Sequence, residues 1–225
     1  MDIPTSPDQT AHLGFLNITQ NNVNKGQLGE WSNPASTPTP AGTDTNHCVS
    51  TPRSPFSSVR RVVTGHTSSG KSIFLEDSVQ PYVFWDDVSG SVVHHLYRTS
   101  EHPAVLDAEV RSEDGCQWVD EIKVNDELVS RDGSTIRSFD MAPGMSVKPH
   151  RTWSIDYGIV HKGCVVLELD GGERKVMKEG DVIIQRGTIH AWKNESMEWN
   201  RIYFVMLPAK PVEIDGRVLD EVSAK

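Results

Sequence analysis

Short runs of β-forming residues, divided by turn signals, fill this chain from residue 59 to residue 207. The turn signals include Pro143-Gly144, Lys162-Gly163 and Arg186-Gly187. Many short strands divided in this way are typical of a β-sandwich or a β-barrel. The sequence therefore predicts an all-β protein. The expected strands cover residues 59–63, 72–75, 92–97, 134–141, 155–161, 164–169, 174–177, 182–185, 190–193 and 199–207.

The N-terminal part of the chain differs in amino-acid composition. Residues 30–58 are dense in Ser, Thr, Pro and Gly and hold few large aliphatic side chains, so they bury too little apolar surface to offset their ordering entropy. We expect residues 1–57 to form an extended, partly flexible arm. Strands flanking the barrel then follow over 58–128, the barrel over 129–208 and a tail over 209–225. One weak helix is expected, within residues 104–110.

Composition excludes several classes of function. The 22 Lys and Arg against 31 Asp and Glu give a formal net charge of −9, whereas nucleic acids and anionic membranes call for a basic face. The N-terminus lacks the charged and apolar regions of a signal peptide, and no apolar run approaches the roughly 20 residues that span a bilayer. We expect a cytoplasmic protein without nucleic-acid or membrane partners. Three widely spaced cysteines indicate neither a disulfide framework nor a zinc knuckle.

Residues 65–72 read GHTSSGKS and match the P-loop pattern letter for letter. A P-loop requires a helix that starts at the lysine and points its amide groups at phosphate. Here Ile73 and Phe74 favour a strand, and Pro81 leaves no room for a helix of ordinary length. We interpret the segment as a hairpin loop and expect no nucleotide cofactor.

The most informative stretch runs from Gly144 to Asn194. Its first half places Gly144, His150, Thr152, Asp156 and Gly163 at intervals of six, two, four and seven positions. Its second half reads GDVIIQRGTIHAWKN from residue 180 to residue 194. Both halves resemble the two motifs of the cupin superfamily, whose usual forms are G-x5-H-x-H-x3,4-E-x6-G and G-x5-P-x-G-x2-H-x3-N. With the flanking strands, the resemblance covers about residues 130–208, and the similar segment RRVVTGHTSSGKSIFLED extends it to most of residues 58–208.

The sequence segments around these motifs are similar to those of small single-domain cupins from bacteria and from fungal metabolite gene clusters. The resemblance implies a cupin double-stranded β-helix, which is a jelly-roll barrel, with additional N-terminal strands and the extended N-terminal arm. Such barrels hold one small ligand inside. It also implies a homodimer, because small cupins usually pair through their N-terminal strands.

Strand alternation predicts which side chains meet inside the barrel. His150, Thr152 and Asp156 lie at even spacing and share one face of an extended strand, while His190 and Trp192 share a face of another. We expect His150, Asp156 and His190 to converge on one interior catalytic site, with Thr152 bonding the substrate. Isolated structural histidines are the alternative.

Metal binding is a separate question from the shape of the site. Two imidazoles and a carboxylate suit Fe, Mn, Zn, Ni or Cu, so His150, Asp156 and His190 are candidate metal ligands. The sequence departs from the cupin pattern, however, because Thr152 replaces the second His and Asp156 replaces the usual Glu. The alternative is a metal-free site in which His and Asp transfer protons.

Further side chains are candidates for substrate binding. Trp192 is two positions after His190 and so points to the same face of the strand, and we interpret it as a wall of the cavity. Trp153 can supply a second aromatic wall, with packing in the core as the alternative. Arg137 can orient a carboxylate or an enolate, although exposure to solvent is the ordinary fate of an arginine.

These residues favour an enzyme that acts on a small carbonyl- or carboxyl-containing metabolite, such as a polyketide intermediate. A His/Asp/His cluster supplies proton transfer, which serves a lyase or an isomerase that decarboxylates, dehydrates or cyclises its substrate. A metal-dependent dioxygenase and a non-catalytic small-molecule binder are the alternatives.

Overall fold

The computed structural model describes residues 53–86, 88–106, 110–112, 115–116 and 118–223. Most of the expected N-terminal arm, residues 1–52, lies outside the described residues. The strands are β1 (Arg60–Thr67), β2 (Ser72–Val79), β3 (Val83–Phe84), β4 (Val92–Arg98), β5 (Val110–Ser112), β6 (Gly115–Cys116), β7 (Thr135–Met141), β8 (Ser154–Lys162), β9 (Cys164–Leu169), β10 (Arg174–Lys178), β11 (Val182–Arg186), β12 (His190–Lys193), β13 (Asn200–Pro208), β14 (Glu213–Ile214) and β15 (Arg217–Val218).

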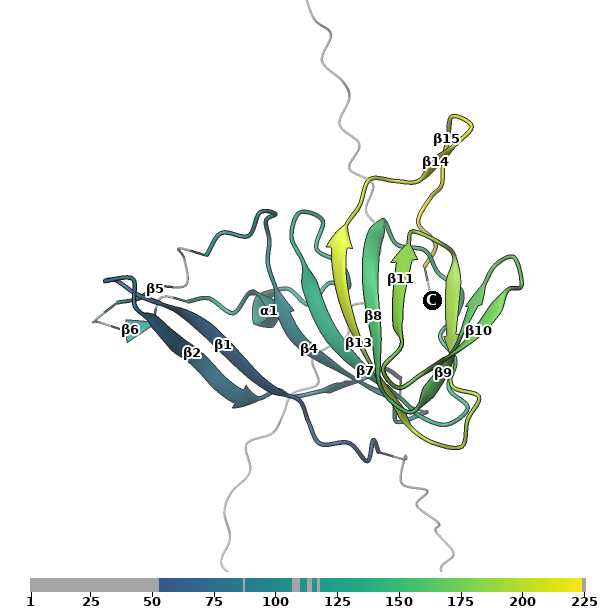
Figure 1. Cartoon of the computed structure of the whole chain (residues 1–225), viewed down its shortest axis with the longest axis horizontal. Coiled ribbons are helices and arrows are strands. Elements are labelled where there is room, and N and C mark those ends of the chain that lie inside the picture. The colour runs from purple at the N-terminus through teal and green to yellow at the C-terminus, as the bar shows by residue number, and fades with distance from the viewer. Residues whose placement is uncertain (1–52, 87, 107–109, 113–114, 117, 224–225) are drawn as a thin grey trace, which may run out of the picture. The chain divides into compact units, whose positions relative to one another are not determined.

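Two antiparallel sheets enclose the core of the barrel. The larger sheet has the strand order β11-β8-β13-β7-β4-β3, and the smaller has the order β10-β9-β12 (Figure 1). Apolar side chains from both sheets pack together in one cluster, because alternate residues of each strand point inward. Members of this cluster include Met141, Val160, Val165, Trp192 and Ile202. The predicted all-β class and jelly-roll fold are confirmed.

The hairpin of β1 and β2 stands in a separate sheet with the order β2-β1-β5-β6. One face of the hairpin buries Val63 and Leu75, while the other face is exposed. Residues 65–72 form the tip of this hairpin: residues 68–71 connect the strands, and the amide of Thr67 at the end of β1 donates to the carbonyl of Lys71 over 2.8 Å. The interpretation of this segment as a hairpin loop is confirmed, and the absence of nucleotide binding stays a prediction.

The prediction of a helix within residues 104–110 is wrong for the residues that are described. Residues 104–106 are irregular and Val110 begins β5, whereas the helix of the described chain, α1 (Glu121–Val124), lies further on. Val105 and Leu106 are exposed, so a helix here would have no apolar face packed against the sheet. So short a helix is unstable without such packing.

The C-terminal segment is ordered along the start of β8. Arg151 and Val222 exchange two backbone hydrogen bonds, and the indole of Trp153 donates to the carbonyl of Leu219 over 3.0 Å. This segment carries the small hairpin of β14 and β15. In the described part of the chain, no helix has the length and apolar character needed to cross a membrane.

Candidate active site

The register of the larger sheet brings polar residues to one end of the barrel. Asp156 on β8 pairs with Gln185 on β11 and with Met206 on β13. Arg137 on β7 pairs with His95 on β4 and with Phe204 on β13. Because cross-strand partners point to the same face, these residues line the inner face together.

The two motif histidines lie at this same end. His150 lies shortly before the start of β8. It forms an isolated antiparallel β-bridge with His190, the first residue of β12. We call the set of His95, Arg137, His150, Asp156, Gln185 and His190 the polar end of the barrel. The apolar cluster fills the opposite end, where Met141 on β7 pairs with Asn200 at the start of β13.

The imidazoles of His150 and His190 lie side by side. Their ring centroids are 4.3 Å apart, and the ring planes meet at 57°. Nδ1 of His150 lies 2.9 Å from the carbonyl oxygen of Lys148, and Nδ1 of His190 lies 2.9 Å from that of Thr188. A carbonyl only accepts, so each Nδ1 carries the proton and donates it. Each Nε2 therefore keeps a lone pair, and among the described residues neither Nε2 has a hydrogen-bond partner.

The surroundings keep both imidazoles neutral. Burial and, to a lesser extent, the nearby imidazole of His150 together lower the pKa of His190 to about 4, against a smaller opposing effect from the Thr188 carbonyl. Burial also lowers the pKa of His150, against a smaller opposing effect from the Lys148 carbonyl. Both shifts follow from the cost of placing a charge where water is scarce. A neutral imidazole with a free Nε2 can accept a proton from a substrate.

Asp156 is perturbed in the opposite direction. It is 6% exposed, and burial raises the pKa of its carboxyl group to about 6, against a smaller opposing hydrogen bond from Ser154. Its Oδ1 atom is buried without a hydrogen-bond partner among the described residues. Thr152 lies on the same face of the chain, with its hydroxyl 2.7 Å from that of Ser154. The carboxyl group is thus available to a ligand or to water.

The three candidate metal ligands do not meet as a set. In the described ranges of the chain, no three His, Cys, Asp or Glu side chains are grouped closely enough to hold a metal ion. His150 and His190 form a pair, and Asp156 lies on the same inner face without completing a cluster with them. Two imidazoles are fewer protein ligands than the three that a catalytic metal site usually has. As they stand, these residues do not fit the metal that the cupin pattern implies.

The candidate substrate-binding residues occupy three different environments. Trp192 is 3% exposed and packs in the apolar cluster, with its ring 6.3 Å from that of His190. Trp153 alternates with Thr152 and Ser154, so it points away from the imidazole pair and contacts the C-terminal segment. Arg137 is 7% exposed and belongs to the polar end, which places it inside the barrel and away from solvent.

Sequence reasoning missed two side chains of the polar end. His95 and Gln185 both point inward, and both ring nitrogens of His95 and the amide nitrogen of Gln185 are buried without a partner among the described residues. Gln185 lies in the second motif, where the alternation of side chains along the strand could have predicted that it points inward. His95 belongs to a strand outside both motifs, and its position depends on the pairing of β4 with β7.

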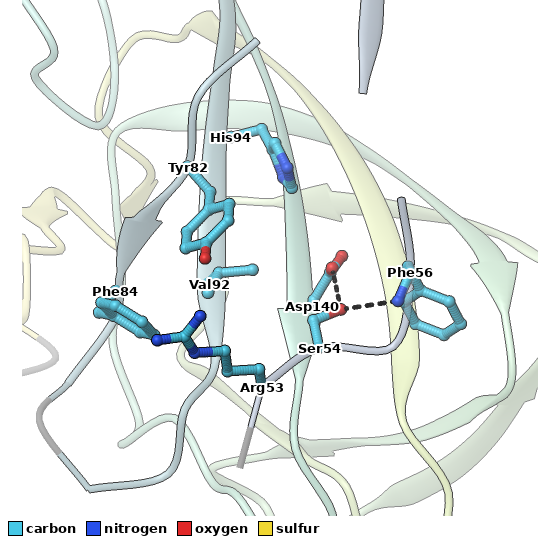
Figure 2. A pocket seen from close by; sticks show the side chains of 8 residues that line it. All are labelled: Arg53, Ser54, Phe56, Tyr82, Phe84, Val92, His94 and Asp140. Atoms are coloured by element: carbon cyan, nitrogen blue, oxygen red, sulfur yellow. Dashed lines mark hydrogen bonds between the residues drawn. The ribbon is translucent and has the colours of Figure 1, made fainter. Parts of the chain in front are cut away.

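A cavity of about 80 Å³ lies on the other face of the same sheet. Asp140 and His94 line it, and both alternate with the inward-facing Arg137 and His95 (Figure 2). Figure 2 shows the carboxylate of Asp140 beside Ser54, whose hydroxyl donates to it over 2.6 Å. Arg201 holds the same carboxylate through two hydrogen bonds of 2.6 and 2.7 Å. Asp140 is thus fully paired, and this site fastens residues 53–57 to the sheet.

The sequence matches the model of the cupin domain over residues 137–206. Phomopsin biosynthesis cluster protein D of Diaporthe leptostromiformis is 38% identical over 168 residues, which are 72% of this chain and 85% of that protein. The chain belongs to the cupin family. Its resemblance to cupins is thereby confirmed, and the matched region contains the strands that carry Arg137, Asp156, Gln185 and His190.

Other relatives of this cupin also come from fungi. Oryzines biosynthesis cluster protein J of Aspergillus oryzae is 34% identical, over 76% of this chain and 95% of that protein. The cupin-domain-containing oxidoreductase fogC of Aspergillus ruber is 31% identical, over 73% of this chain and 80% of that protein. Among solved structures, a cupin 2 conserved barrel domain protein from Salinispora arenicola overlies 34% of this chain and 64% of its own, with 27% identity and a TM-score of 0.32.

Proposed function

We propose that this cupin is an enzyme that moves protons on a small carbonyl- or carboxyl-containing metabolite. The observation that carries the proposal is the imidazole pair, whose two Nε2 atoms are unprotonated and unpaired in the described structure. The relatives named for phomopsin and oryzine biosynthesis clusters support a role in the synthesis of a secondary metabolite. A polyketide intermediate is a metabolite of the proposed class.

The proposed reaction is that of a lyase or an isomerase. One Nε2 removes a proton from the carbon beside a carbonyl group, which leaves an enolate and an imidazolium. The proton then returns to another carbon in an isomerisation, or to a leaving hydroxyl group, which departs as water. The pKa shifts of His190 and Asp156 are opposite in direction and suit a base and an acid. The lowered pKa keeps His190 an unprotonated base, while the raised pKa lets Asp156 hold its proton to higher pH.

An oxidoreductase is the second candidate function. The printed names of relatives at 30–31% identity, among them fogC of Aspergillus ruber and virC of Hypocrea virens, favour it. Such a reaction changes the oxidation state of the substrate, whereas a proton transfer does not. The products of the two candidates therefore differ in composition.

The test uses the full chain and the metabolite that accumulates in a strain lacking its gene, incubated in heavy water. We expect either an isomer or a decarboxylated product that carries deuterium on carbon, or a product that has lost water. His150→Gln should slow this turnover by roughly two or more orders of magnitude, since it removes a proton acceptor. The matched control is His161→Gln, whose ring is on the exposed face of β8 and packs on Tyr203, and which should leave the rate unchanged.

Two outcomes would contradict the proposal. A product that has lost hydrogen or gained oxygen, with no deuterium on carbon, would favour the oxidoreductase. Binding of the metabolite without turnover, weakened by His150→Gln, would favour a non-catalytic binding protein.

A further inference from the structure

Unpartnered polar atoms gather at the polar end of the barrel. In the described part of the chain, nine buried side-chain nitrogen and oxygen atoms have no hydrogen-bond partner. Six of them belong to inward-facing residues of the larger sheet. Five lie at the polar end, two in His95 and one each in Arg137, Asp156 and Gln185, and the sixth, Oδ1 of Asn200, lies at the opposite end. Most buried polar groups in folded proteins are paired, so a cluster of exceptions on one face indicates a place that a polar ligand completes.

Arg137 is the strongest cation of this cluster. Its side chain is nine-tenths buried, and its guanidinium donates to the backbone carbonyls of Asp126 and Glu127 through one nitrogen. Its Nε–H group has no partner, and no carboxylate of the described residues lies within ion-pair distance of it. The neighbouring Arg98 differs, because its guanidinium pairs with the carboxylate of Glu127 at 3.3 Å. Arg137 is therefore a buried cation without an ion-pair contact in the described chain, although the nearby charge of Asp126 raises the pKa of its guanidinium against the larger, lowering effect of burial.

His95 adds a second donor next to Arg137. The two residues are direct cross-strand partners of β4 and β7, and both point to the inner face of the sheet. Neither ring nitrogen of His95 has a partner. A neutral imidazole carries one N–H group, so this ring can donate to an anion that Arg137 attracts. Charge-assisted hydrogen bonds of this kind are stronger than neutral ones.

We propose that Arg137 and His95 form a subsite that binds a carboxylate group of the substrate. The inference rests on the proposed function, because the subsite would orient the acid so that its reacting carbon faces the imidazole pair. The enzyme's substrate is then a small organic acid, not a neutral carbonyl compound. Arg137 and His95 bind and position the substrate, whereas His150 and His190 transfer the proton.

The test compares acetate with acetamide, which has a similar shape and no charge, as probes of the purified full chain. The ring resonances of His95 are followed by NMR during each titration. We expect acetate to shift them saturably and acetamide to leave them in place. The adjacent His94 is the internal control, because it points to the opposite face and should not respond.

A substitution then assigns the acetate site to Arg137. Arg137→Gln should weaken acetate binding by about tenfold or more, the scale of a lost charge-assisted hydrogen bond. Arg60→Gln, which removes an exposed arginine paired with Asp77, should not change it. If Arg137→Gln fails to fold, His95→Phe replaces it. Calorimetric titration, which needs no signal from the missing ring, should then show no difference between acetate and acetamide.

The subsite and the proposed function can fail separately. Equal responses to acetate and acetamide, or no response to either, would overturn the subsite. Acetate binding that survives in His150→Gln is expected, because that residue lies outside the subsite. Acetate binding to a protein whose turnover is unaffected by His150→Gln would support the subsite and contradict the proposed proton transfer.

Discussion

At the scale of single residues, burial acts in opposite directions on the acids and bases of the polar end. Leaving water destabilises the charged form of any group, so it raises the pKa of Asp156 and lowers that of His190. The neutral forms of both groups therefore coexist between about pH 4 and pH 6. Above that range Asp156 is ionised, and its charge can stabilise an imidazolium formed on the same inner face.

Asp156→Asn should stabilise the protein at neutral pH. The pKa of Asp156 rises from 3.8 to about 6 on folding, so the folded state favours the protonated carboxyl group. As the pH rises through about 6 this group ionises in the folded protein, and the folded state then bears the cost of a buried charge. Above that pH the wild-type protein carries a penalty of roughly 3 kcal/mol, at about 1.4 kcal/mol per pKa unit. The variant has no charge to bury. Chemical denaturation between pH 4 and pH 8 should give a free energy of unfolding that exceeds that of the wild type above pH 6, with the difference shrinking towards pH 4.

The control for this prediction is Asp77→Asn. The hydrogen bond from Arg60 lowers the pKa of Asp77, so its carboxylate form is the favoured one in the folded state. This variant should gain nothing at high pH. A difference between Asp156→Asn and the wild type that stays constant with pH would contradict the account of Asp156.

At the scale of elements, the turn between β8 and β9 shows how closely the chain is packed around the barrel. Gly163 has a φ of +73°, and a Cβ atom added to it would lie 2.7 Å from the carbonyl oxygen of Trp199. Gly180, which precedes β11, has a φ of +90° and open space around the same position. Both turns need a residue with a positive φ, but one of them also needs the absence of a side chain.

Gly163→Ala should therefore cost more stability than Gly180→Ala. The positive φ alone costs an alanine about 1–2 kcal/mol at either position. Gly163→Ala must in addition displace backbone of residue 199, so its loss in free energy of unfolding should exceed that of the control by about 1 kcal/mol or more. Urea denaturation of the two variants measures the difference. Equal losses would show that the β8–β9 turn relaxes without cost.

The expected strands compare closely with the observed ones, since β9 and β12 begin and end where the turn residues predict. Strand parity also predicts the inward-facing set of Thr152 and Asp156. It does not predict which strands become neighbours, and the position of His95 beside Arg137 depends on that pairing. The contact of Trp153 with the C-terminal segment could likewise not be predicted from the sequence, because it joins residues 66 positions apart.

At the scale of the whole molecule, one face of the β1–β2 hairpin carries large apolar side chains among polar ones, and these stay exposed in the described part of the chain. Val62, Phe74 and Val79 lie on this face and are 44%, 68% and 64% exposed. Large apolar side chains gathered on an exposed face mark interaction surfaces. We propose that a second copy of the chain covers them, as the resemblance to small cupins implies.

Phe74→Lys should shift this equilibrium towards monomer, because it places a charge in the proposed contact. Light scattering after size exclusion should give the mass of a dimer for the wild type and of a monomer for the variant at the same concentration. Tyr157→Lys is the control, since Tyr157 is also partly exposed but lies on the outer face of β8. A wild-type monomer, or an equal effect of both variants, would contradict the homodimer.

The proposed proton transfer requires a neutral imidazole pair whose Nε2 atoms are free to accept protons. NMR titration of the histidine rings measures this most directly, with His150→Gln and His190→Gln used to assign the signals. We expect the pKa of His190 to lie at about 4 and that of His150 below 6.5, with both rings carrying their proton on Nδ1 at neutral pH. In His150→Gln the pKa of His190 should rise while staying below 6.5, because burial remains. Two rings that titrate near 6.5, or that are protonated on Nε2 at neutral pH, would contradict the proposed proton transfer.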